Sequence, residues 1–122
     1  MSVIVGFMYD KLNDFGILTA AGDSPDIINM GDATAERMAV DLKLPEGDIT
    51  SVSGVTVKVM GGDSAASITN TIVQSGAVAA ADLNRDGYSL PIPKTRFKFL
   101  RVNITGFTAG KIQAIINSYL GK

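Results

Sequence analysis

The stretch KFLRVNIT, residues 98–105, has the clearest pattern in the chain. In it Phe99 and Arg101 alternate with the apolar residues Leu100, Val102 and Ile104. Because successive side chains of a β-strand point to opposite faces of a sheet, this spacing predicts a strand that buries one face and exposes the other.

Similar runs of β-branched and apolar residues recur along the chain, separated by Gly, Pro, Asp, Asn and Ser about every eight to twelve residues. They predict strands at residues 16–21, 26–30, 37–44, 55–60, 68–74 and 88–92. With about eight strands in one small domain, the sequence predicts an all-β fold, specifically a jelly-roll-like antiparallel β-sandwich.

Two of these runs repeat the alternation of residues 98–105. The first, 37–44, would bury Met38, Val40, Leu42 and Leu44. The second, 55–60, would bury Val55, Val57 and Val59. The last segment, 111–120 (KIQAIINSYL), fits a helical stripe as well as a strand face with Ile112, Ala114, Ile116 and Leu120 on one side. A strand is favoured there, because a short Ile-rich run between Gly110 and Gly121 matches the rest of the chain.

The composition excludes several classes of function. The 122 residues suit a single domain, residues 1–122, and the balance of 11 Lys and Arg against 12 Asp and Glu has no basic excess with which to hold a phosphate backbone. There is no Cys and no His, so thiolate chemistry and the commonest general base are both absent. We therefore expect no nucleic-acid partner, no enzymatic activity and no cofactor.

The segment DLNRDGY, residues 82–88, resembles the first half of a calcium loop. Oxygen ligands at the first, third and fifth positions and Gly at the sixth are present, but Pro93 occupies the twelfth, where a bidentate Glu is needed. The pattern is more typical of a β-turn, in which Asn and Asp bond the local backbone. We expect a turn and no metal.

Two other catalytic patterns also have simpler interpretations. In GFTAGKI, residues 106–112, the glycines are too close for a phosphate loop and Ile112 replaces the Ser or Thr that would hold magnesium, so a tight connection between strands is expected. Six carboxylates that fall in or near predicted turns are expected to cap the backbone or to be solvated: Asp23, Asp26, Asp32, Glu36, Glu46 and Asp48.

The first residues are rich in apolar side chains, which would be exposed on a free terminus. We interpret residues 1–15 as an apolar N-terminal arm that either packs into its own core or forms an interface. Its interface candidates are Val3, Ile4, Phe7, Met8, Tyr9 and Phe15. The apolar run is too short for a membrane span and has no preceding basic region, so we expect neither membrane insertion nor export.

Three segments support a resemblance to a known family: MYDK at 8–11, DIINMG at 26–31 and LPIPKTRFKFLRVNITGFTAGKIQAII at 90–116. In this order they are similar to the small capsid cement, or decoration, proteins of short-tailed bacteriophages, the family that includes the cement protein of a Bordetella phage. The longest segment matches the family's pattern of a Pro-bearing strand, a basic turn, an aromatic-hydrophobic-Arg strand and a Phe-Thr-Ala-Gly-Lys link.

The resemblance implies a virion protein that is made in the host bacterial cytoplasm and binds the outer surface of an icosahedral capsid. Its partners would be the major capsid protein and itself, as a homodimer or homotrimer. The candidate polar contacts to the capsid are Arg37, Lys94, Arg96 and Lys98.

A carbohydrate- or receptor-binding β-sandwich is the alternative, since that class shares the architecture. Its site would be expected where Tyr88 lies near Asn84 and Asp86, the one cluster of an aromatic ring with Asn and Asp.

Overall fold

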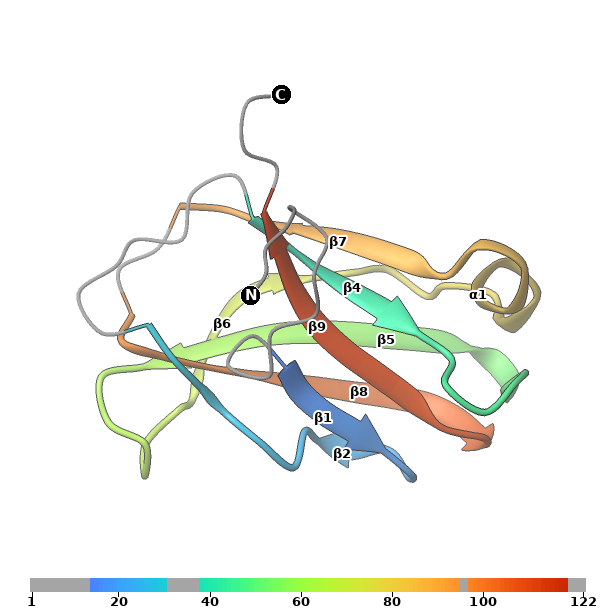
Figure 1. The fold of residues 1–122 in the computed structure, drawn as a ribbon, viewed down its shortest axis with the longest axis horizontal. Helices are drawn as coiled ribbons and strands as arrows, with labels where there is room; N and C mark the ends of the chain where they lie inside the picture. Colours follow the sequence, from blue (N-terminus) through green and yellow to red (C-terminus); the bar gives the residue numbers. More distant parts are fainter. Residues whose placement is uncertain (1–13, 31–37, 95–96, 119–122) are drawn as a thin grey trace, which may run out of the picture.

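The computed structural model describes residues 14–30, 38–94 and 97–118. Within them the chain forms nine strands and one short helix (Figure 1). The strands are β1 (Asp14–Leu18), β2 (Gly22–Asp23), β3 (Ile28–Asn29), β4 (Met38–Lys43), β5 (Thr50–Gly62), β6 (Asn70–Gln74), β7 (Tyr88–Ile92), β8 (Phe99–Ala109) and β9 (Ile112–Ser118), and the helix is α1 (Ala80–Asp86).

The strands form two antiparallel sheets, which confirms the predicted all-β sandwich. Sheet A has the strand order β1-β9-β4-β7, and sheet B has the order β2-β8-β5-β6, with β3 also paired to β8. In Figure 1 sheet A lies in front of sheet B. The chain changes sheet after β1, β3, β4, β6, β7 and β8, so the connections hold the two layers together.

The core lies between the sheets and follows the predicted alternation. In β8 the side chains of Leu100, Val102 and Ile104 are completely buried, while Phe99 and Arg101 on the other face are partly exposed. The matching residues of β5, namely Val55, Val57 and Val59, are also completely buried. β8 pairs with β5 in a register that sets Val102 opposite Val59. These two strands therefore provide the central wall of the core.

The last described segment is a strand, as favoured from the sequence. β9 runs between β1 and β4 in the middle of sheet A, and it buries Ile112, Ala114 and Ile116. A helix here would have left β1 and β4 without a common neighbour, so the backbone pairing of sheet A selects the strand.

Both long strands of sheet B extend beyond their predicted ends. β5 begins at Thr50 rather than Val55, and β8 continues to Ala109 rather than ending at Thr105. The expectation that residues 106–112 form only a tight connection was therefore wrong. The extension depends on Gly106, which has φ +99° and lies so close to Gly54 that a Cβ would be 2.1 Å from its carbonyl oxygen. With glycine there, the irregular pairing with β5 can continue past Thr105.

Residues 80–86 form a helix where the sequence analysis expected a turn. α1 has no side-chain cap at Ala79, but its last turn ends with the N–H of Gly87 donating to the carbonyl of Leu83 at 2.8 Å. Leu83 is buried in the core and is 1% exposed. The burial of this one leucine, together with the alanines that begin the helix, explains why a helical turn wins over a β-turn.

Early strands are shorter than predicted. β1 covers 14–18 instead of 16–21, and β3 covers only Ile28–Asn29 of 26–30. β2 was not predicted, because two residues carry no periodicity. Among the described residues no helix is long and apolar enough to cross a membrane.

Candidate functional site

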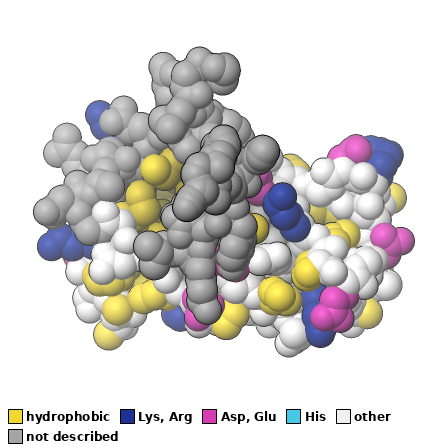
Figure 2. Space-filling view, in the orientation of Figure 1, with side chains coloured by type: hydrophobic (Ala, Val, Ile, Leu, Met, Phe, Trp, Pro, Cys, Tyr) yellow, Lys and Arg dark blue, Asp and Glu magenta, His cyan; other side chains and the backbone are white. Residues whose placement is uncertain are grey.

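The polar residues of 82–88 are bonded within the protein. The Asn84 side chain pairs with Ile49, accepting from its N–H at 2.9 Å and donating to its carbonyl at 3.2 Å. Asp82 and Asp86 both accept from the Arg85 guanidinium, at 2.9 and 2.8 Å. Figure 2 shows charged side chains at the α1 end of the molecule. The bond and charge of Asp86, followed by the charge of Asp82, raise the pKa of Arg85 above its ordinary value.

These contacts describe a structural role for the segment. Within the part of the chain that the structure describes, no three Asp, Glu, His or Cys residues come together as a possible metal site. Asn84 fastens α1 to the connection between β4 and β5, and its side-chain oxygen is occupied by a backbone N–H.

The cluster proposed for a sugar site is divided by the fold. Tyr88 and Asp86 line an open groove of about 430 Å³ between β4 and the end of α1, but Asn84 does not line it. Tyr88 lies opposite Leu42 in the β4–β7 register and packs partly against the core. A sugar platform needs the flat face of an aromatic ring in solvent, so this inward packing argues against that role.

The polar wall of the same groove has partners of its own. Asp41 accepts from the hydroxyl of Ser89 at 2.7 Å and from the side-chain amide of Asn117 at 2.8 Å. These bonds link β7, β4 and β9 across the outer face of sheet A. They stabilise strand pairing, as cross-strand polar contacts do.

Phe15 was expected to be an interface candidate, and the structure corrects this. Its side chain lies in β1 and is 0% exposed, within the core between the sheets. It therefore cannot contact another molecule without unfolding of β1. The other candidates of the N-terminal arm, Val3, Ile4, Phe7, Met8 and Tyr9, lie outside the described residues.

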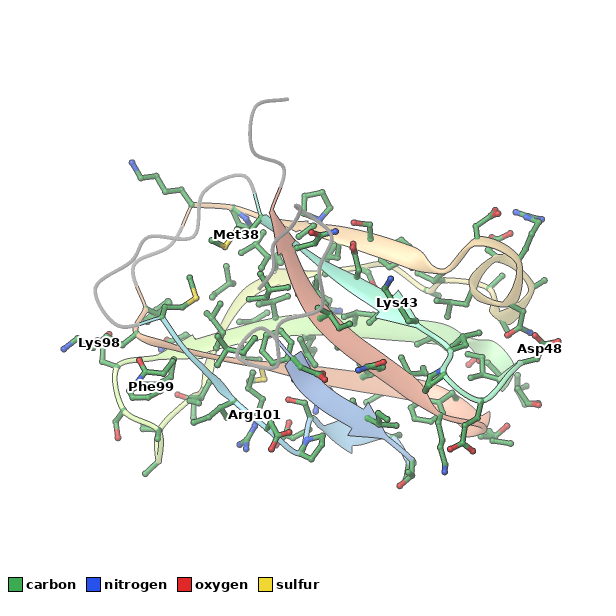
Figure 3. The ribbon with its side chains drawn as sticks, viewed as in Figure 1. Met38, Lys43, Asp48, Lys98, Phe99 and Arg101 are labelled. Atoms are coloured by element: carbon green, nitrogen blue, oxygen red, sulfur yellow. The ribbon has the colours of Figure 1, made fainter. Side chains whose placement is uncertain are left out.

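Two of the four candidate cations lie in the described part, and both are exposed. Lys94 follows the end of β7, and Lys98 precedes β8 and accepts the N–H of Met30 at its carbonyl, at 2.6 Å. Figure 3 shows Lys98 at one end of the sandwich, with Phe99 beside it; Met38 lies farther in, in the same half of the molecule. Arg37 and Arg96 lie outside the described residues.

Three partly buried apolar residues lie at the strand ends and in the connection next to these lysines. Met30, Met38 and Phe97 are partly buried and pack against the core from this end. The Phe97 ring lies so close to Gly61 that a Cβ there would be 2.6 Å from it. We call this surface the lysine end and define it by Met30, Met38, Lys94, Phe97 and Lys98. Figure 2 shows hydrophobic and basic atoms together at this end of the molecule.

The lysines of this surface were predicted from the sequence as candidate contacts, but its apolar residues were not. Met30 and Met38 lie at strand ends and Phe97 in a connection. Alternation predicts that Met38 faces the core, but it does not predict that the three residues lie at one end of the sandwich. The fold brings them together because β7, β8, β3 and β4 all begin or end here.

No protein-family model matches the chain, and no curated protein matches its sequence significantly. What the protein does has to be inferred from the fold and from the surfaces described above.

Proposed function

We propose that the protein is a structural virion protein that binds the outer surface of an icosahedral phage capsid and cements neighbouring major capsid subunits. It would work there as an oligomer of identical chains, without catalysis and without a cofactor. The observation that carries the proposal is the lysine end, where partly exposed Met and Phe side chains lie beside two exposed lysines.

The composition of this surface is that of a protein-binding site. Met and aromatic residues are enriched in protein interfaces, where they fill pockets of the partner. Lysines at the rim contribute little to affinity but attract an acidic surface and orient it. Lys94 and Lys98 are placed for this task, on either side of Phe97.

The topology supports the jelly-roll part of the proposal. Strands pair in nested fashion: β1 with β9, β2 and β3 with β8, β4 with β7, and β5 with β6. This nesting is expected when one long hairpin wraps into two sheets, which is the jelly-roll arrangement of many viral capsid domains.

The sequence resemblance also bears on this surface. Its longest segment, residues 90–116, runs from β7 through β8 into β9 and includes Lys94, Phe97 and Lys98. The segment that is similar to cement proteins therefore contributes three of the five residues of the lysine end.

Cementing needs only modest contacts for each copy. A ligand that binds the assembled shell and not its separated subunits stabilises the shell by mass action. When the copies are linked as an oligomer, the first contact raises the effective concentration of the others. Co-sedimentation with capsids that lack the decoration protein tests the proposal, since a cement protein must travel with the shell at a fixed stoichiometry.

A further inference from the structure

One flank of the sandwich is formed by a segment that contains no charged residue. Residues 64–81, which run from the end of β5 through β6 to the start of α1, are the longest stretch of the sequence without Asp, Glu, Lys or Arg. Most of them are exposed. Exposed surface ordinarily carries about 25–35% charged residues, so this flank differs from the rest of the molecule.

The centre of this flank is β6, which ends sheet B among the described residues. An edge strand presents unpaired N–H and C=O groups, and proteins usually protect such edges with charges, proline, β-bulges or very short strands. The other described edges have these features: β7 contains Pro91, β1 contains Asp14, and β2 and β3 have two residues each. β6 has five residues, NTIVQ, with neither charge nor proline.

The side chains of β6 also suit a partner strand. The register with β5 shifts between Val59 and Met60, which adds one residue to β6 and makes a β-bulge at Ile72, the one protective feature of this edge. As a result Ile72 and Val73 are both partly buried, and neither is fully covered by its own sheet. Three consecutive residues, Thr71, Ile72 and Val73, are β-branched and favour an extended, paired backbone.

We propose that β6 pairs antiparallel with β6 of a second copy of this chain, joining two copies of sheet B into one continuous sheet across a two-fold axis. An antiparallel pair of identical strands is self-complementary, because residue i of one copy meets residue j of the other and the reverse. A charge in this strand would face a like charge near the axis and repel it, and residues 64–81 contain none.

The size of the contact predicts a weak dimer. Five residues from each copy are far fewer than the 20–30 a side of a standard interface, so association is expected at about 10 µM to 1 mM. The inference rests on the proposed function only for its place of action: on a shell, effective concentration would favour the weak pairing.

The test is sedimentation velocity of the full chain from about 10 µM to 1 mM, comparing wild type with Thr71→Lys. Wild type should pass from monomer to dimer, and Thr71→Lys should raise the dissociation constant at least tenfold. The matched control is Thr105→Lys, since Thr105 is also an exposed strand threonine of sheet B but lies in β8, opposite Thr56 of β5 and away from the β6 edge. It should dimerise like wild type. If Thr71→Lys does not fold, Asn70→Lys, at the start of the same strand, replaces it in the test and should weaken the dimer in the same way.

Hydrogen exchange locates the contact. The amides of β6 should become more protected as protein concentration rises, while those of β7 should not change. A wild type that stays monomeric, a Thr71→Lys dimer as tight as wild type, or protection at another edge would each overturn the inference. Capsid binding is measured separately, so a protein that stays monomeric in solution and still binds the shell would refute the edge pairing and leave the proposed capsid binding intact.

Discussion

Asn84 and Ile49 form a two-bond pair that joins α1 to the connection between β4 and β5. The Asn84 side chain accepts the N–H of Ile49 at 2.9 Å and donates to its carbonyl at 3.2 Å, as a neighbouring strand would. Ile49 is 3% exposed, so its backbone groups have little access to water that could replace this pairing.

Replacing Asn84 by Ala should therefore destabilise the fold. Losing both bonds leaves a buried N–H and carbonyl without partners, which costs about 1–3 kcal/mol. The midpoint of thermal unfolding should fall by roughly 4–15 °C. The matched control is Asn103→Ala, which removes one exposed side-chain bond to Asp23 and should change the midpoint much less. Equal decreases of the unfolding midpoint in the two variants would show that the contact with Ile49 stabilises the fold no more than an exposed side-chain bond does.

Gly106→Ala should lower the free energy of unfolding more than an alanine substitution at another glycine of similar φ. A Cβ at Gly106 would be 2.1 Å from the carbonyl oxygen of Gly54, so β8 must separate from β5. Gly47 has φ +101°, but a Cβ added there would have no atom within 4 Å. Gly47→Ala therefore carries only the backbone strain, about 1 kcal/mol. Urea unfolding should give a difference of more than about 2 kcal/mol between the two variants. Similar stabilities would mean that β5 and β8 do not approach here as described.

Phe15→Ala should lower stability by about 3–5 kcal/mol, because it empties a completely buried site between the sheets. Ile17→Ala is the control from the same strand, since Ile17 is 41% exposed and should cost far less. Chemical denaturation at low protein concentration measures both. If Phe15→Ala kept its stability but lost self-association, Phe15 would be an interface residue and its assignment to the core would be wrong.

Lys94→Glu and Lys98→Glu, made separately, should each weaken capsid binding at least tenfold without changing the free energy of unfolding by more than about 0.5 kcal/mol. Each substitution replaces an exposed positive charge by a negative one, which would repel the acidic surface that is proposed as the partner. Lys43→Glu makes the same change in sheet A, away from Lys98 (Figure 3), and should bind as wild type does. Equal loss in all three variants would indicate a general charge effect instead of a specific surface.

The strands of the core were predictable because burial on one face imposes a period of two. Leu100, Val102 and Ile104 show that period in the sequence and are buried in the structure. The β7 bounds, 88–92, match the prediction for the same reason, with Gly87 and Pro93 at its ends.

Features that depend on single contacts were not predictable in this way. α1 is held by one buried leucine and by the Asn84 contact to a residue 35 positions away, neither of which leaves a periodic signal. The sequence did contain a weaker indication: Ala79, Ala80 and Ala81, then Asp82 in the first turn, Arg85 in the last turn and Gly87 after it. Likewise Met30, Met38 and Phe97 lie at one end of the sandwich only because of the topology, so the sequence indicated the lysines of the lysine end but not its apolar residues.

The most direct measurement of the central claim is co-sedimentation of the purified chain with capsids that lack their decoration protein, on a density gradient. We predict that the protein travels with the shell at a fixed stoichiometry, set by the symmetry axes it occupies, and raises the temperature at which the shell opens. If the protein remains at the top of the gradient at concentrations where it is folded, and the shell opens at an unchanged temperature, the cement function is contradicted.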